Sequence, residues 1–387
     1  MKNIKINPGF RSGIIKVPQS KSIAHRVLIC AALSNYNNIL DIDLSQDISA
    51  TIEALKVLKT GGDIINCGES ASTLRFIMPV AAALGASVIF TGEGRLTERP
   101  NIYPEILRIK NGRLQSGKYY IPGNISSQFI SGLLFALPII DGDSEIILTS
   151  PAESEPYVNM TVQVLSEFGV NIIKDKTGYK IKGGQEYKYT DYKIEGDYSQ
   201  GAFFACMAAI NGDIKICGLS AVSLQGDSKI IEILRGFGAA VDFDGDILHA
   251  VKCGDLQGIK IDAAQIPDIV PVLAVVAAYA RGESMIYNAG RLRLKESDRI
   301  HAVYELLTGI GADVCEMRDG LIIKGGNKLR GGRVKSFGDH RIAMSAAVAA
   351  VGTESGIIID DMACMNKSYP GFLKDFEGLN NGFCMGK

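Results

Sequence analysis

The chain has 387 residues, and a hydrophobic content of 47% is enough for two domains with sizeable cores. Its 41 Lys and Arg residues nearly balance its 42 Asp and Glu residues, so the net charge of −1 gives no electrostatic reason to expect a nucleic acid or an acidic membrane as a partner. None of the eight Cys residues forms a CxxC pair or lies at zinc spacing with the four His residues, so we expect reduced thiols in a cytoplasmic protein.

The chain opens with residues 1–17, whose alternating pattern predicts a pair of strands with Pro8-Gly9 as the turn. This stretch lacks the apolar core of a signal peptide, and the longest apolar runs further on are too short to cross a bilayer. Residues 18–33 form a predicted helix that is apolar on most of its circumference, which is typical of a buried helix. An amphipathic helix follows at 43–63 and ends at a Gly-Gly pair.

The buried helix with a polar first turn recurs about six times along the chain. Its later copies are expected at 69–86, 124–140, 195–210, 266–280 and 338–352. Free backbone N–H groups at the start of a helix attract anions, and basic side chains nearby add to that attraction. The sequence therefore predicts an anion site built from several helix starts.

A second pattern repeats between the buried helices: an amphipathic helix, a glycine, a strand, a turn and another strand. The glycines that end these helices, Gly169, Gly238 and Gly311, recur about every 70 residues, which indicates a repeated structural unit. Six such units predict an α/β fold with two domains of three units each. If the polar helix starts of each domain point the same way, the two domains form an anion-binding cleft.

Several candidate residues also have a purely structural alternative. Ser22, Ser126 and Ser127 can cap helices with or without binding a ligand. The basic residues near the helix starts could instead be solvated surface charges; these are Lys21, Arg75, Arg99, Arg341 and Lys367. Their recurrence where buried helices begin favours a binding role.

The acidic candidates lie in two further segments. In RLRLKESDRI, Glu296 could form a solvated ion pair with Arg299. Alternatively, it is a carboxylate held among Lys295, Arg293 and Arg299, poised for proton transfer. Asp268 either caps its apolar helix or acts as a base, and His340 is either a polar residue at a helix start or a proton-transfer group. The sequence has no GxxxxGK[ST] motif and no strand-linked GxGxxG motif, which argues against P-loop and dinucleotide sites.

With these residues assembled, the sequence resembles the 5-enolpyruvylshikimate-3-phosphate (EPSP) synthase family, the 3-phosphoshikimate 1-carboxyvinyltransferases, within the enolpyruvyltransferases. The resemblance covers nearly the whole chain. It rests on these motifs in the family order: PQSKSIAHR, ESASTLRF, LTERP, SSQF, SEPY, EGDYSQ, QGD, IPD, LRLKESDR, FGDHR and NKSYPGF. KESDR, GDHR and SSQF together make the signal strong.

The resemblance implies a two-domain inside-out α/β prism, in which each domain has three βαβαββ-like units around buried helices. One domain would comprise residues 20–195, and the other residues 1–19 together with 196–387, with the active site in the cleft between them. The implied reaction transfers the enolpyruvyl (carboxyvinyl) group of phosphoenolpyruvate to the 5-hydroxyl of shikimate 3-phosphate and releases phosphate, in the shikimate pathway to chorismate and aromatic amino acids. No metal or organic cofactor is implied, and we expect a monomer.

The resemblance also implies roles for the residues at matching positions. Those expected to contact shikimate 3-phosphate are Lys21, Ser22, Arg26, Ser126, Ser127, Gln128, Ser154, Tyr157, Asp268 and Lys295. Those expected to contact phosphoenolpyruvate are Lys21, Ala71, Arg99, Gln128, Arg299, Arg341 and Lys367. Asp268 would take the hydroxyl proton and Glu296 would serve the methylene group, while Lys21 reaches both substrates. His340 is a further catalytic candidate.

The chain departs from the family pattern at three places. Ala71 replaces the family's usual glycine beside phosphoenolpyruvate, and we expect its methyl group to reduce sensitivity to the herbicide glyphosate. The stretch between Gly62 and Asn66 is too short for the usual strand pair, and residues 107–122 are also shortened. Arg291 stands where some members have Asn, so no substrate contact is assigned to it.

Two other functions are alternatives to this one. A UDP-N-acetylglucosamine enolpyruvyltransferase shares the repeated fold but would need a loop Cys near position 100, and LTERPN has none. A non-catalytic anion-binding module of the same fold would have no use for both Asp268 and Glu296.

Overall fold

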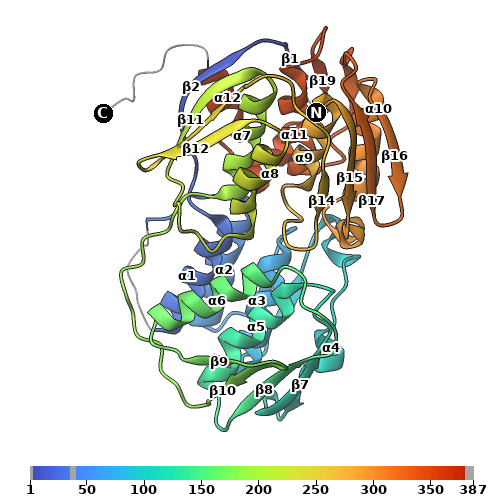
Figure 1. The fold of residues 1–387 in the computed structure, drawn as a ribbon. Coiled ribbons are helices and arrows are strands. Elements are labelled where there is room, and N and C mark those ends of the chain that lie inside the picture. The colour runs from blue at the N-terminus through green and yellow to red at the C-terminus, as the bar shows by residue number, and fades with distance from the viewer. Residues whose placement is uncertain (1–2, 35–40, 380–387) are drawn as a thin grey trace. The chain divides into compact units, whose positions relative to one another are not determined.

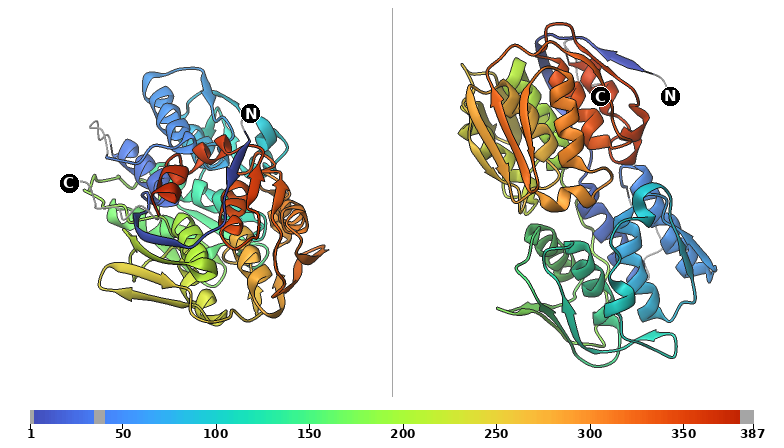
Figure 2. Two further views of the ribbon diagram at one scale, coloured as in Figure 1. Left: turned by 90° about the horizontal axis from the view of Figure 1, so that it is seen from above. Right: turned by 90° about the vertical axis from the view of Figure 1, so that its right-hand side faces the viewer.

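The computed structural model describes residues 3–34 and 41–379. The chain divides into two compact units, which we call unit 1 (Met1–Gln19 with Glu195–Lys387) and unit 2 (Ser20–Ile194). Figures 1 and 2 show that each unit combines helices with mixed sheets, in agreement with the predicted α/β class. Among the described residues, no helix is long and apolar enough to cross a membrane. Seven cysteines are free thiols, and Cys384 lies outside the described residues.

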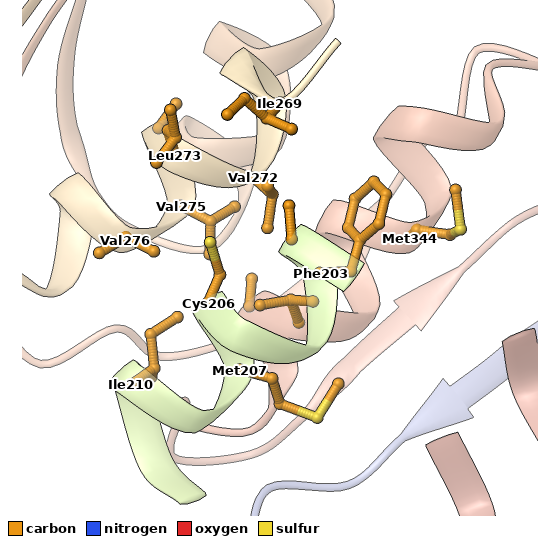
Figure 3. Close-up of a cluster of buried hydrophobic side chains, with 14 of the residues drawn as sticks. Phe203, Cys206, Met207, Ile210, Ile269, Val272, Leu273, Val275, Val276 and Met344 are labelled. Atoms are coloured by element: carbon orange, nitrogen blue, oxygen red, sulfur yellow. The ribbon is translucent and has the colours of Figure 1, made fainter. Parts of the chain in front are cut away.

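Three buried helices form the core of unit 1: α7 (Tyr198–Asn211), α9 (Val270–Tyr279) and α11 (His340–Ala350). Each is apolar around nearly its whole circumference beyond the first turn, so it can pack against neighbours on every side. Figure 3 shows this packing, with Cys206 of α7 beside Val275 of α9. The prediction of buried helices at these three places is confirmed.

Amphipathic helices lie outside this core. α8 (Ile230–Gly236) packs on α7, and α10 (Arg299–Gly309) packs on α9. α12 (Phe372–Gly378) contacts α7 through the ring of Phe372, which lies 5.5 Å from that of Phe204. These helices bury one face each, as the period of their apolar residues predicts.

Two four-stranded sheets of unit 1 share one design. Their strand orders are β12-β13-β11-β2 and β14-β15-β17-β16, and each consists of a parallel pair joined to an antiparallel hairpin. The first contains β2 (Arg11–Lys16), β11 (Gly212–Cys217), β12 (Ala240–Asp244) and β13 (Ile247–Val251). The second contains β14 (Lys260–Asp262), β15 (Gly282–Tyr287), β16 (Asp313–Met317) and β17 (Gly320–Gly325).

The N-terminal strands differ from the prediction of a strand pair. β1 (Ile4–Ile6) pairs with β19 (Ile357–Ile359) in a sheet that also contains β18 (Gly332–Val334), whereas β2 pairs with β11. Pro8-Gly9 therefore connects two different sheets instead of closing a hairpin. Residues 7–10 form no turn in the structure, and β1 and β2 each pair with a strand far along the chain instead.

The core of unit 2 contains α1 (Lys21–Leu33), α3 (Ala71–Leu84) and α5 (Ser127–Ala136), as predicted. Two amphipathic helices pack against them, α2 (Gln46–Thr60) and α6 (Glu155–Glu167). The sheet β7-β8-β10-β9 repeats the design of unit 1. Its strands are β7 (Gly117–Ile121), β8 (Ser144–Leu148), β9 (Ile172–Lys174) and β10 (Gly178–Ile181).

The repeat is reduced where the sequence is short. β3 (Ile64–Asn66) pairs only with β4 (Ile89–Thr91) in a two-stranded parallel sheet. The segment 107–122 contains a two-stranded ribbon of β5 (Ile109–Lys110) and β6 (Arg113–Leu114), which follows the single-turn helix α4 (Tyr103–Ile106). The complete repeats are regular in comparison: Gly169, Gly238 and Gly311 each end a helix with a positive φ, a conformation that a side chain disfavours.

Candidate functional site

Arg299, the first residue of α10, is 1% exposed and binds three carboxylates. Its Nε donates to Asp339 at 2.8 Å, its Nη1 to Asp268 at 2.9 Å and its Nη2 to Glu296 at 2.8 Å. A planar guanidinium can serve three acceptors in fixed directions, so it sets the relative positions of all three groups. Burial alone would lower the pKa of Arg299, but the three carboxylates raise it instead. The Glu296–Arg299 ion pair predicted from their spacing is confirmed, but Arg299 is buried and the Glu296 side chain is only 16% exposed.

Asp339 fixes the starts of two helices at once. It caps α11, because its Oδ1 accepts the backbone N–H of Arg341 at 2.9 Å. Its Oδ2 accepts the hydroxyl of Ser297 at 2.9 Å as well as the Arg299 bond. The carboxylate is fully buried, and these charge-assisted bonds compensate for its burial.

Asp268 lies two residues before α9 and is not its cap, since Ile269 occupies that position. Besides Arg299, it faces Lys295 at 3.7 Å and Arg341 at 3.6 Å. Burial would raise the pKa of Asp268, but these three cations hold it well below the usual range. Asp268 is therefore ionised in the structure and can accept a proton once anions offset the surrounding cations.

The remaining candidates of unit 1 are also buried rather than solvated. Arg341 is 3% exposed and Lys367 is also 3% exposed, so the surface-charge alternative is wrong for both. Arg341 donates from Nη1 to the carbonyl of Ser199 at 3.2 Å. His340 lies with Nδ1 3.7 Å from Asp339. Lys367 ends a short 3₁₀ helix, Ala363–Lys367, that packs on α11.

In unit 2, Arg26 on α1 binds only neutral acceptors. Its Nε donates to Thr161 Oγ1 at 2.8 Å and its Nη2 to the carbonyl of Tyr157 at 2.7 Å, while its Nη1 donates to the carbonyl of Ser22. The side chain is 2% exposed, and burial lowers the pKa of Arg26 to about 10, which leaves it charged at neutral pH. The structure thus brings Ser22, Arg26 and Tyr157 together, as the resemblance implied.

Arg75 joins the start of α3 to that of α5. It donates from Nη1 to Gln128 Oε1 at 2.8 Å, and Gln128 Nε2 in turn donates to Ser72 Oγ at 2.9 Å. The guanidinium also donates to the carbonyl of Pro100 at 2.7 Å. Arg75 is 4% exposed, so its surface-charge alternative is wrong, and its part in orienting Gln128 was not foreseen.

Hydroxyl groups gather where α5 and α6 begin. Ser126 caps α5 by accepting the N–H of Gln128 at 3.3 Å, and Ser127 follows it on the helix. Ser154 precedes α6 with a positive φ of 54°, an uncommon conformation for a residue with a side chain that occurs more often at functional sites. A backbone bond of 3.0 Å from Glu153 N to Gly123 O ties the two preceding loops together.

Three further candidates lie at other positions of unit 2. Lys21 forms a 2.6 Å ion pair with Asp47, a partner that the sequence did not suggest. Ala71 is the first residue of α3 and is 5% exposed, and Arg99 is half-buried. Ser20 occupies the capping position of α1, where its carbonyl, not its side chain, meets the first turn.

Sequence reasoning missed a polar group at the start of α7. Asp227 is 1% exposed and accepts the hydroxyl of Ser199, and neither side-chain amide atom of the neighbouring Gln200 has a hydrogen-bond partner among the described residues. Polar side chains within an otherwise apolar stretch were the available signal.

Arg291 donates to the carbonyl of Ala264 at 2.6 Å. The described residues contain no cluster of three or more His, Cys, Asp or Glu that could hold a metal ion.

The family model described as EPSP synthase (3-phosphoshikimate 1-carboxyvinyltransferase) matches residues 8–62 and 101–376. A 3-phosphoshikimate 1-carboxyvinyltransferase of Clostridium kluyveri is 43% identical over 98% of this chain and 97% of its own length. One from Clostridioides difficile is 43% identical over 98% of both chains. Both alignments are longer than 387 positions, so these relatives have residues that this chain lacks.

Two solved structures share the fold. An EPSP synthase from Acinetobacter baumannii has a TM-score of 0.78 at 23% identity and covers 98% of both chains. The enolpyruvyl transferase NikO from Streptomyces tendae has a TM-score of 0.70 at 15% identity and covers 97% of both. The unmatched interval of the family model, 63–100, includes the reduced β3–β4 sheet and Ala71.

Proposed function

Since the chain belongs to the EPSP synthase (3-phosphoshikimate 1-carboxyvinyltransferase) family, we propose that it transfers the carboxyvinyl group of phosphoenolpyruvate to the 5-hydroxyl of shikimate 3-phosphate and releases phosphate. It is a transferase of the shikimate pathway that leads to aromatic amino acids. The observation that carries the mechanism is the single Arg299 guanidinium, which holds Asp268 and Glu296 in fixed positions.

The reaction requires two proton movements. The 5-hydroxyl oxygen loses a proton as it bonds to C2 of phosphoenolpyruvate, and the C3 methylene gains one to become methyl. We propose that Asp268 accepts the hydroxyl proton and that Glu296 donates the proton to the methylene group, which together complete the addition step. In the elimination step that follows, the methyl group returns its proton to Glu296 and the C–O bond to phosphate breaks. The proton held by Asp268 leaves with the phosphate.

Substrate charge prepares Asp268 for this role. Its pKa is held low by Lys295, Arg299 and Arg341 while burial opposes them. Anionic substrates that bind these cations offset their charge, so the pKa of Asp268 rises towards that of a useful base. Binding and base strength are thereby coupled.

The two sets of residues would share the substrates. We assign the carboxylate of shikimate 3-phosphate to Ser22, Arg26 and Tyr157, because Arg26 carries a buried charge with only neutral partners. Its phosphate is assigned to the hydroxyls at the starts of α5 and α6, with Lys295 nearby and Gln128 against the ring. Phosphoenolpyruvate is assigned to Lys21, Ala71, Arg99, Arg299, Arg341 and Lys367. His340 is kept as a secondary proton-transfer candidate.

The direct test is phosphate release from the full chain when both substrates are mixed. Release that requires both shikimate 3-phosphate and phosphoenolpyruvate is expected. Release with UDP-N-acetylglucosamine in place of shikimate 3-phosphate would favour the related enolpyruvyltransferase, and binding without release would favour a non-catalytic module.

We also propose that the enzyme works as a monomer in the cytoplasm, in keeping with seven free thiols in the structure. Light scattering coupled to gel filtration should give about 41.5 kDa at concentrations used for the assay. A stable dimer would contradict the monomer, and recovery of the native protein outside the cytoplasmic fraction would contradict the location.

A further inference from the structure

A chain of contacts in unit 1 links a buried carboxylate to the proposed phosphoenolpyruvate ligand Arg341. Asp227, in the 3₁₀ turn Gly226–Lys229, accepts the hydroxyl of Ser199 at 2.5 Å. The carbonyl of the same serine accepts Arg341 Nη1 at 3.2 Å, and Arg341 Nη2 lies 3.6 Å from Asp268. One serine at the start of α7 therefore contacts both the buried acid and the arginine.

Arg341 has little freedom to move away from this arrangement. Its guanidinium lies 5.9 Å from the ring centre of Phe203, on the same helix as Ser199. Its backbone N–H is bound by the capping carboxylate of Asp339. The guanidinium is thus held beside the Phe203 ring and at the Ser199 carbonyl, where it faces Asp268 directly and is linked to Asp227 through Ser199.

Asp227 and Asp268 differ in the charge that they carry near neutral pH. Burial, together with the charge of Asp268, raises the pKa of Asp227 to about 7, and the Ser199 hydrogen bond and Arg341 only partly oppose this. Asp197, the capping residue of α7, adds a further like charge. Asp268 stays ionised, because three cations face it. Of these two carboxylates, Asp227 is therefore the one that changes charge near neutral pH.

We propose that Asp227 is a positioning residue that acts through Ser199 and Arg341, and that it couples proton uptake to the binding of the anionic phosphoenolpyruvate. This inference rests on the proposed function. When Asp227 is neutral, the charge of Arg341 is available to the ligand. When Asp227 is ionised, it competes with the ligand for that charge, and so ligand binding weakens.

The sign of the effect follows from linkage. A bound anion adds negative charge near Asp227 and raises its pKa, so the complex binds more protons than the free enzyme. Affinity for phosphoenolpyruvate therefore falls as pH rises through neutrality. Between the free and bound pKa values of a single group the loss is at most about tenfold per pH unit.

Other groups titrate in the same range, so the wild-type profile alone is not decisive. Burial lowers the pKa of Lys295 to about 8, and the substrate phosphate has its own ionisation. Both are unchanged in an Asp227 variant. The difference between two profiles thus isolates Asp227.

The experiment measures KM and kcat for phosphoenolpyruvate from about pH 6 to about pH 9 in wild type, D227N and S199A. Asn keeps the size and the acceptor oxygen but cannot ionise. At the acid end we expect the KM of D227N to match that of wild type. Towards the alkaline end the KM of wild type should rise about three- to tenfold more than that of D227N, with kcat changed much less. S199A removes the bond that favours the ionised form, so its KM should rise at a higher pH than in wild type.

A KM profile in D227N that is parallel to that of wild type would overturn the proposal. If D227N does not fold, S199A decides: an unshifted or acid-shifted midpoint overturns it. Calorimetry in two buffers of different ionisation enthalpy should also show less proton uptake on phosphoenolpyruvate binding in D227N. Absence of turnover in the wild type itself would refute the proposed function instead, so the two failures are distinguishable.

Discussion

Two buried arginines, one in each unit, are stabilised in opposite ways. Arg299 of unit 1 binds three carboxylates, and these raise its pKa. Arg26 of unit 2 binds a hydroxyl and two carbonyls, and burial lowers its pKa to about 10. Both side chains are almost fully buried, so exposure does not explain the difference.

The different partners of Arg26 and Arg299 suit two different tasks of an enzyme that acts on anions: binding the anion and orienting the groups that transfer protons. The positive charge of Arg26 is not neutralised by a neighbouring acid, so it remains available to a ligand carboxylate. The charge of Arg299 faces three carboxylates within the protein, so besides its proposed contact to phosphoenolpyruvate it fixes the positions of the two that we assign to proton transfer. We therefore propose that Arg26 mainly holds a ligand anion and that Arg299 mainly orients the carboxylates assigned to proton transfer.

The largest expected effect comes from removing proton transfer and keeping the geometry. Glu296→Gln retains the size of the side chain and an oxygen that can accept from Arg299. We expect substrate binding to be kept and kcat to fall by about 100- to 10,000-fold. Single-turnover kinetics with equilibrium binding would check both, and fully retained turnover would refute the role of Glu296.

The next largest effect tests the comparison of Arg299 with Arg26 through the free energy of unfolding. Arg299→Met leaves the buried carboxylate of Asp339 without its cation, so we expect the free energy of unfolding to fall by about 3–5 kcal/mol. Arg26→Met leaves only neutral acceptors and should cost about 1–3 kcal/mol. Urea denaturation of both variants measures the difference.

Acidification provides the control for that pair. The deficit of Arg299→Met should shrink as pH falls, because protonation neutralises the stranded carboxylates, whereas that of Arg26→Met should not. Equal losses with equal pH dependence would contradict the distinction between the two arginines.

A smaller effect concerns the methyl group of Ala71, at a position where the family resemblance leads us to expect glycine. Ala71 is buried at the first position of α3, where we expect phosphoenolpyruvate and glyphosate to compete. A methyl group in a close-fitting pocket is worth about 1–3 kcal/mol, so Ala71→Gly should tighten glyphosate inhibition by about tenfold or more. The ratio of the inhibition constant to the KM of phosphoenolpyruvate is the measurement, and an unchanged ratio would refute this role.

Local patterns in the sequence were enough to predict the buried helices and the Glu296–Arg299 pair. The buried helices follow from apolar residues a few positions apart, and Glu296 lies only three positions before Arg299, in the bend that precedes α10. The Arg299–Asp339 bond joins residues 40 positions apart in the sequence. The strand pairs β1–β19 and β2–β11 join segments that lie still further apart along the chain. Such contacts depend on tertiary packing, which no short motif records.

Burial was the main source of error for individual site residues. Arg75, Arg341 and Lys367 were each compatible with a solvated surface charge, because most Lys and Arg side chains are exposed. The structure buries all three. The family resemblance supplied roles for Arg341 and Lys367, but Arg75 acts through Gln128, and a positioning contact of that kind leaves no signature in one sequence.

The smallest predicted effect distinguishes the substrates by pH. Burial lowers the pKa of Lys295 to about 8, so its charge is lost at a pH where Arg26 remains protonated. The KM for shikimate 3-phosphate should rise a few-fold, about two to five times, between pH 7.5 and pH 8.5, and Lys295→Arg should flatten that rise because arginine keeps its charge.

A loss of folding stability through Lys295 cannot explain this loss of substrate binding, because Lys295 affects stability in the opposite direction. The unfolded chain holds the Lys295 proton up to its ordinary pKa of about 10.4, so between about pH 8 and that value the unfolded state binds more protons than the folded one. The contribution of Lys295 to stability therefore increases with pH while its contribution to binding decreases. A rise in KM of equal size in Lys295→Arg would assign the loss to another group and remove Lys295 from the phosphate site.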